Sequence, residues 1–95
     1  MIIALDYDKT YTADPSLWDK FINDCKDKGH TVICITMRKP ILAEEIDRTI
    51  FAVDRLYYTS RKAKMVYAKL NRIDVDIWID DKPGWLFDDA PSAEG

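Results

Sequence analysis

The sequence opens with Ile2-Ile3-Ala4-Leu5-Asp6-Tyr7-Asp8-Lys9-Thr10-Tyr11-Thr12. Its first four residues are apolar and include no turn former, which predicts a short buried strand. Two carboxylates, Asp6 and Asp8, follow where that strand leaves the core. Residues i and i+2 of an extended chain point to the same side, so both carboxylates can converge if the backbone bends. Because such groups repel each other unless a cation or a proton neutralises one, the stretch predicts either a cation site or a strand that simply ends in a polar loop.

The length and composition indicate one folded domain. The chain has 95 residues, of which 47% are hydrophobic and 33% charged, as is usual for a globular protein. We expect residues 1–87 to form this domain and residues 88–95 to form a flexible C-terminal tail. The net charge of −3 argues against a general affinity for nucleic acid, although a local basic patch stays open.

Cysteine usage and hydropathy indicate a cytoplasmic protein without a membrane segment. Cys25 falls in a helical pattern and Cys34 in a strand pattern, so both are interpreted as reduced core residues. The first apolar run is too short for a signal sequence, and no segment has transmembrane length. His30 is the single histidine and no cysteine pair has ligand spacing, so a zinc site is not expected. We expect His30 at the end of the sheet opposite Asp6 and Asp8.

Helical and strand patterns alternate along the rest of the chain. We predict a helix from Pro15 to Gly29, a strand over 30–36, a short helix over 40–46, a strand over 55–59, a helix after Thr59 or Ser60 as its cap, and a strand over 76–81. The inward-facing residues of the two longer helices are expected to be Leu17, Trp18, Phe21, Ile22 and Cys25, and Ala63, Val66, Tyr67 and Leu70. This alternation predicts an α/β protein with parallel strands and right-handed crossovers.

We expect a three-layer Rossmann-like fold, with about four parallel strands in the order 4-1-2-3 and helices on both faces. In such sheets the functional crevice lies beyond the carboxyl ends of the strands. The reactive residues all follow strand ends or begin the next helix, so this order brings them together: Asp6, Asp8, Thr36, Lys64, Asp80 and Asp81.

Carboxylates, a hydroxyl and an ammonium without a nearby histidine or cysteine suit a hard cation, with Mg²⁺ the default. A carboxylate beside bound Mg²⁺ can attack phosphorus. Thr36 can donate a hydrogen bond to a phosphoryl oxygen, and Lys64 can add a positive charge. Asp8 is placed to protonate the leaving oxygen and later to activate water.

The ordered set of motifs resembles the haloacid dehalogenase (HAD) superfamily. Asp6-Tyr7-Asp8-Lys9-Thr10 is similar to its DxDxT signature, Thr36 to its second motif, Lys64 to its third, and Ile79-Asp80-Asp81 to its fourth. The resemblance implies that Asp6 is a nucleophile that forms an aspartyl-phosphate and that Asp8 is the general acid and base. It also implies that Asp6, the backbone carbonyl of Asp8, and Asp80, with Asp81 assisting, hold Mg²⁺.

Several details depart from the family pattern or stay open. Lys9 stands where the family often has glycine, and Lys62 is an alternative to Lys64 as the phosphate-binding lysine. No interval leaves room for the cap domain that many relatives carry. We expect Thr10, Arg38 and Lys62 to contact the substrate, which is a phosphorylated compound. Basic residues are expected in the loops on the rim of the site, and they suggest that the substrate is a nucleotide or a polynucleotide end: Arg38, Lys39, Arg61 and Lys62, with Lys9 adjacent.

Other classes of protein fit less well. An EF-hand loop starting at Asp6 would need glycine at Tyr11 and glutamate at Leu17. A response-regulator receiver would need an aspartate at the end of the third strand, where Thr59 stands. The remaining alternative is a protein of the same fold that binds phosphate or nucleic acid without catalysis.

Overall fold

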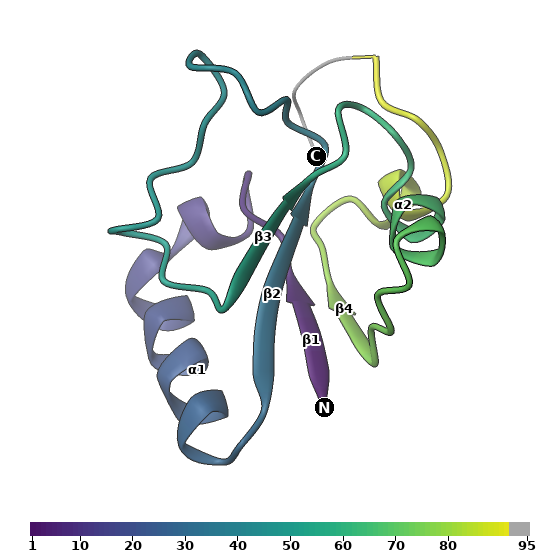
Figure 1. Cartoon of the computed structure of the whole chain (residues 1–95). Coiled ribbons are helices and arrows are strands. Elements are labelled where there is room, and N and C mark those ends of the chain that lie inside the picture. Colours follow the sequence, from purple (N-terminus) through teal and green to yellow (C-terminus); the bar gives the residue numbers. More distant parts are fainter. Residues whose placement is uncertain (92–95) are drawn as a thin grey trace.

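A parallel four-stranded sheet forms the centre of the computed structural model, which describes residues 1–91 (Figure 1). The strands are β1 (Ile2–Leu5), β2 (Thr31–Thr36), β3 (Arg55–Tyr58) and β4 (Ile77–Ile79). Their order across the sheet is β3-β2-β1-β4, and each neighbouring pair is parallel. Read from the β4 edge this order is 4-1-2-3, so each strand has the neighbours that the sequence predicts.

The two central strands are apolar on both sides because both faces of the sheet are covered. Alternate residues point to opposite faces and enter two separate cores. One core includes Ile3 and Leu5 of β1, and the other includes Ala4. The helix α1 (Pro15–Asp27) covers the first face and α2 (Lys64–Leu70) the second (Figure 1).

The helix α1 begins and ends at the predicted signals. The side chain of Asp14 accepts a hydrogen bond from the backbone N–H of Leu17 at 3.3 Å, and Pro15 is the first helical residue. Gly29, at φ 80°, takes the left-handed conformation that follows many helix ends. Ile22 and Cys25 are buried as predicted, whereas the predicted inward-facing Leu17 is exposed.

The orientation of α2 differs from the prediction. Val66 and Leu70, predicted to face the core, are 50% and 79% exposed, whereas Lys64 and Ala68 are buried. Lys64 and Ala68 are four residues apart and therefore share one helix face. The helix thus turns its first lysine inward, and the hydrophobic stripe predicted from the sequence is wrong at two positions.

The connection from β2 to β3 contains no helix, so the short helix predicted over 40–46 is wrong. The backbone carbonyl of Glu44 accepts from Arg38 Nη1 at 2.9 Å, and the Glu44 carboxylate accepts from the backbone N–H of Lys39 at 2.8 Å. These bonds hold the segment in turns instead of an α-helical ladder. Farther along the connection, Phe51 and Val53 enter the core on the α1 face.

A short 3₁₀ helix follows each of β1 and β4: η1 (Tyr11–Ala13) and η2 (Pro83–Leu86). After η2 the chain returns to the start of α2. Asp89 accepts from the backbone N–H of Ala63 at 2.8 Å, and the backbone N–H of Ala90 donates to the carbonyl of Arg61 at 2.9 Å. These bonds connect Asp89 and Ala90 to the segment before α2. The flexible tail over residues 88–95 stays a prediction, and residues 92–95 lie outside the described part of the chain.

Two further features bear on the sequence predictions. Within residues 1–91, no helix combines the length and the apolar character needed to cross a membrane. Cys25 and Cys34 are buried, unpaired thiols.

Candidate active site

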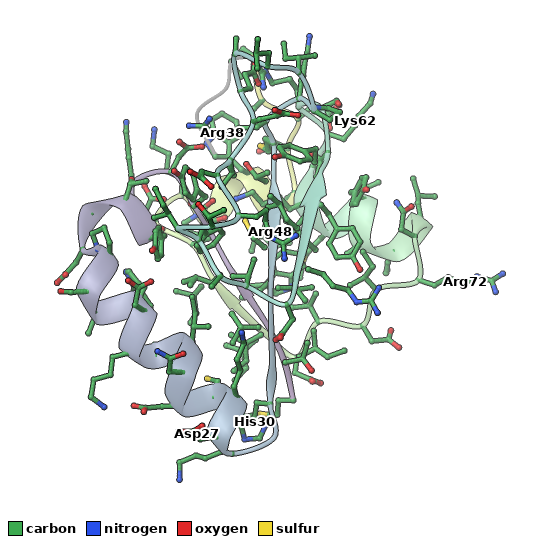
Figure 2. The ribbon with its side chains drawn as sticks, turned by 60° about the vertical axis from the view of Figure 1, so that its left-hand side comes forward. Asp27, His30, Arg38, Arg48, Lys62 and Arg72 are labelled. Atoms are coloured by element: carbon green, nitrogen blue, oxygen red, sulfur yellow. The ribbon has the colours of Figure 1, made fainter. Side chains whose placement is uncertain are left out.

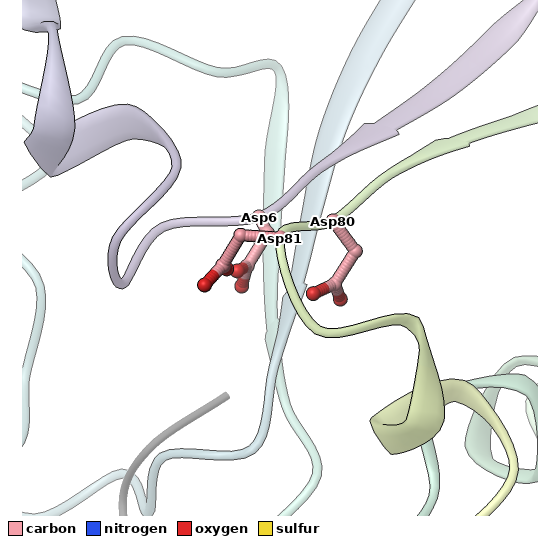
Figure 3. A group of neighbouring side chains, drawn as sticks. All are labelled: Asp6, Asp80 and Asp81. Carbon is pink, nitrogen blue, oxygen red and sulfur yellow. The ribbon is translucent and has the colours of Figure 1, made fainter.

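Parallel pairing of β1 and β4 brings their following carboxylates together. Leu5 pairs with Ile79, and the backbone N–H of Asp6 continues the ladder by donating to the carbonyl of Ile79 at 2.9 Å. The next residue of each strand, Asp6 and Asp80, therefore leaves the sheet beside the other. Figure 3 shows Asp6, Asp80 and Asp81 pointing to the same side at this carboxyl edge.

These aspartates form a group that fits a divalent cation. Asp6, Asp80 and Asp81 each offer one carboxylate oxygen, and these oxygens lie within 4.8 Å of one another. Burial falls from Asp6, which is buried, to Asp81, which is exposed, so the group is open on one side. A set of carboxylate oxygens without nitrogen or sulphur ligands fits Mg²⁺, which keeps several waters or substrate oxygens in its shell.

Lys64 is the basic residue that enters this group. Its Nζ donates to Asp6 Oδ1 at 2.9 Å and to Asp80 Oδ2 at 2.6 Å, and its side chain is 1% exposed. Lys62, the alternative, has a side chain that is 71% exposed and lies 3.9 Å from Asp89. Of the two lysines, Lys64 is therefore the one that lies at the aspartate group.

The turn between β3 and α2 carries Lys64 to the site through a strained backbone. Ser60 and Arg61 have φ angles of 54° and 73°, in the left-handed region that costs about 1–2 kcal/mol per non-glycine residue. The Thr59 hydroxyl donates to the carbonyl of Lys62 at 2.7 Å, and no side chain caps α2. The predicted cap by Thr59 or Ser60 is therefore wrong, because that hydroxyl closes the turn instead.

Burial sets the charge balance of the site. Burial raises the pKa of Asp6 to about 7, Lys64 opposes that rise, and the nearby Asp80 adds to it. Burial alone would lower the pKa of Lys64, but the charges and hydrogen bonds of Asp6 and Asp80 outweigh it and raise that pKa. The ammonium is therefore charged at neutral pH, and a cation beside Asp6 would favour the ionised carboxylate.

Thr10, whose contact with the substrate stays a prediction, lies between two carboxylates. Its Oγ1 lies 3.3 Å from Asp6 Oδ2 and 3.1 Å from Asp81 Oδ1, and it accepts from the backbone N–H of Asp81 at 3.2 Å. One hydroxyl proton serves one carboxylate at a time. Because Thr10 is buried, its hydroxyl orients the aspartates.

Asp8 and Arg38 form a separate ion pair. Arg38 Nε and Nη2 donate to the two carboxylate oxygens of Asp8 at 2.9 and 2.7 Å. The Asp8 side chain does not belong to the aspartate group at the ends of β1 and β4. The substrate contact of Arg38 and the metal contact through the Asp8 carbonyl stay predictions, and the side chains of the two residues bind each other.

Thr36 lies at the end of β2, next to β1 in the sheet. It is fully buried, and its Oγ1 accepts from the backbone N–H of Arg38 at 3.3 Å. Its hydroxyl proton has no role in that bond and can be donated elsewhere. His30 occupies the opposite end of the molecule from Arg38 and Lys62, as expected, and Figure 2 labels all three.

Sequence reasoning missed the ion pair between Arg38 and Asp8 and also a second one, between Arg61 and Glu44. Arg61 Nη1 and Nη2 donate to the two carboxylate oxygens of Glu44, each at 2.7 Å. Glu44 also holds Arg38 through its backbone carbonyl, so this pair is linked to Asp8. No local pattern marks Glu44, because its segment has the apolar spacing of an ordinary helix.

Fold and site together define a parallel α/β protein with a buried lysine between carboxylates at the carboxyl edge of its sheet. No family model, curated protein or solved structure matches the chain. The geometry of its own residues therefore carries the functional argument.

Proposed function

We propose that this protein is a Mg²⁺-dependent phosphomonoesterase of the HAD type, with a Rossmann-like domain and no cap. The observation that carries the proposal is the buried ammonium of Lys64 between Asp6 and Asp80, with Asp81 beside them. Charged groups are rarely buried without a functional or structural reason. A phosphoryl group brings negative charge to such a centre, and the ammonium and a cation would neutralise it.

Asp6 is the nucleophile in the proposed reaction. One of its oxygens attacks phosphorus, an aspartyl-phosphate forms, and the bond to the leaving oxygen breaks while Asp8, in its protonated form, supplies that oxygen with a proton. Water then attacks phosphorus, Asp8 takes up a proton from the water, and the Asp6–phosphorus bond breaks. Both residues return to their starting states.

The other residues bind charge and orient groups. When bound by Asp6, Asp80, Asp81 and the Asp8 carbonyl, Mg²⁺ would offset the negative charge of the phosphate. Lys64 holds the Asp6 carboxylate in one orientation and favours its ionised, nucleophilic form. Thr36 would donate its hydroxyl proton to a phosphoryl oxygen.

The substrate is a phosphomonoester, and the rim gives limited support for a polynucleotide end. Two arginines of this rim already form ion pairs: Arg38 with Asp8, and Arg61 with Glu44. Because these charges are already neutralised, the electrostatic attraction for a chain of phosphates is weak. A nucleotide or another small phosphate ester is the substrate class that we would test first.

The direct test is hydrolysis of p-nitrophenyl phosphate and of nucleoside monophosphates with added Mg²⁺. We expect turnover that disappears with EDTA and in a folded Asp6→Asn variant, because the amide oxygen is a poor nucleophile. Asp27→Asn is the matched control, since Asp27 is an exposed aspartate at the end of α1, and it should keep wild-type turnover. Full activity of Asp6→Asn would reject Asp6 as the nucleophile.

The same assays distinguish the alternative, a binding module without catalysis. Such a protein would bind phosphorylated nucleotides or oligonucleotides in a saturable, salt-sensitive manner. Its binding would be unchanged in Asp6→Asn, and no phosphoester would be turned over. A panel of phosphorylated metabolites, nucleotides and end-phosphorylated oligonucleotides covers both outcomes.

A further inference from the structure

The ion pair between Arg38 and Asp8 fixes both partners. Arg38 Nε and Nη2 donate to separate oxygens of the same carboxylate at 2.9 and 2.7 Å. Paired parallel hydrogen bonds of this kind define the plane of the carboxylate as well as its position. A lysine, with a single ammonium, would not impose that orientation.

Arg38 is itself held on two other sides. Its Nη1 donates to the carbonyl of Glu44 at 2.9 Å, and its guanidinium carbon lies 5.2 Å from the centre of the Tyr7 ring. The side chains of Arg38 and Asp8 are 23% and 20% exposed. A surface pair contributes little because both side chains lose freedom, but this arginine is already ordered by its other contacts.

The support for Arg38 extends to a second ion pair. The carboxylate of Glu44 accepts two hydrogen bonds from Arg61, and Arg61 Nη1 also donates to the carbonyl of Met37 at 2.9 Å. The backbone N–H of Arg38 donates to Thr36 Oγ1. Arg38 therefore joins Asp8 to Thr36 and to the connection between β2 and β3.

We propose that Arg38 is a positioning residue that orients the Asp8 carboxylate for proton transfer, and not a substrate-binding residue. This inference rests on the proposed phosphatase function. Arg38 keeps all its protons. Paired with Arg38, Asp8 is the carboxylate that takes a proton from the water attacking phosphorus, and the protonated Asp8 so formed gives that proton to the leaving oxygen of the next substrate as its phosphorus–oxygen bond breaks. Each carboxylate oxygen has a second lone pair, so the pairing with Arg38 leaves room for that transfer.

The test is a double-mutant cycle of Arg38→Met and Asp8→Asn on p-nitrophenyl phosphate. We expect Arg38→Met alone to lower kcat by about 10–100-fold with little change in KM, as for other residues that orient a reacting group. In the Asp8→Asn background the same substitution should cause no further loss, because Arg38 acts through Asp8. Single-turnover measurements would keep the slow variants measurable.

Two variants serve as controls. Arg38→Lys keeps the charge but lacks the paired donors, so its kcat should remain close to that of Arg38→Met; it also keeps the test valid if Arg38→Met does not fold. Arg55→Met removes an exposed arginine at the start of β3, away from the carboxyl edge, and should leave kcat unchanged. Stabilisation by Mg²⁺ should persist in Arg38→Met, because Arg38 does not contact the aspartate group.

The outcomes separate this inference from the proposed function. A rise in KM of equal size in both backgrounds would show that Arg38 contacts the substrate and would overturn the positioning role. Wild-type kcat in Arg38→Met, together with an inactive Asp6→Asn, would overturn the positioning role alone. Absence of turnover by the wild-type protein on every phosphoester would overturn both.

Discussion

The ammonium of Lys64 lies 2.9 Å from a carboxylate oxygen of Asp6, and each of these side chains is 1% exposed. They are 58 residues apart in the chain. A buried ion pair is costly to form and costlier to break, because removing one partner leaves a buried charge without compensation. This relationship therefore ties the stability of the folded domain to the charge balance of the candidate active site.

Replacing Lys64 by methionine should destabilise the protein strongly. The substitution keeps an unbranched side chain that is one atom shorter, but it leaves Asp6 and Asp80 without their shared cation, which typically costs about 3–5 kcal/mol. Urea unfolding at neutral pH measures the loss. Lys62→Met is the matched control and should change the free energy of unfolding by less than about 0.5 kcal/mol, because Lys62 is exposed. Equal effects of the two substitutions would contradict the assignment of Lys64.

Mg²⁺ should stabilise the folded protein independently of any turnover. A ligand at 100 times its dissociation constant adds about 2.7 kcal/mol to the free energy of unfolding. We expect this gain in the wild type and in Asp27→Asn, and its loss in Asp80→Asn, because Asp80 supplies one of the grouped oxygens. Thermal unfolding with Mg²⁺ and with EDTA measures the difference. An unchanged gain in Asp80→Asn would place the cation elsewhere.

The central strands and the meeting of Asp6 with Asp80 were predictable from the sequence. Unbroken apolar runs and the Asp14-Pro15 helix start are local signals, and parallel strands with covered faces follow from their alternation. Carboxyl ends of neighbouring parallel strands share one edge, so residues directly after β1 and β4 had to meet there. The opening stretch Ile2–Thr12 thus predicted the position of Asp6, and the end of the last predicted strand predicted that of Asp80.

The ion pairs of Arg38 and Arg61 were not predictable, because each joins residues that no local period connects. Residues 40–46 have helical spacing, yet Arg38 and Arg61 bind Glu44 and hold that segment in turns. The rotation of α2 was missed for a related reason. A lysine is normally assigned to the solvent side of a helix, and only the distant carboxylates of Asp6 and Asp80 make its burial favourable.

Lowering the pH should weaken the fold through Glu44. Its hydrogen bonds from Arg61 and from the backbone N–H of Lys39 lower its pKa from 4.5 to about 2. A lowered pKa means that the folded state binds the proton less well than the unfolded state does. The stability from Glu44 is therefore fully present above pH 4.5 and is lost as the pH falls towards 2.

Denaturant unfolding of wild type and Glu44→Gln across this range measures that contribution. The wild type should be the more stable protein near neutral pH, and the difference should shrink as the pH falls. Glu45→Gln, a change at the exposed neighbouring residue, should follow the wild-type curve. A constant difference between wild type and Glu44→Gln would mean that the charge of Glu44 is not the cause.

Replacing Lys9 by glycine, the residue that the HAD pattern often has at this position, should stabilise the folded protein. Its φ is 62°, in the left-handed region where a side chain is strained by about 1–2 kcal/mol and glycine is not. Glycine also loses about 0.4–1 kcal/mol through the greater freedom of the unfolded chain. Comparing Lys9→Gly with Lys9→Ala removes the lysine side chain from both proteins and isolates the backbone. We expect the glycine variant to unfold at the higher urea concentration, with a net advantage of up to about 1.6 kcal/mol. Greater stability of the alanine variant would show that this turn carries no strain for glycine to relieve.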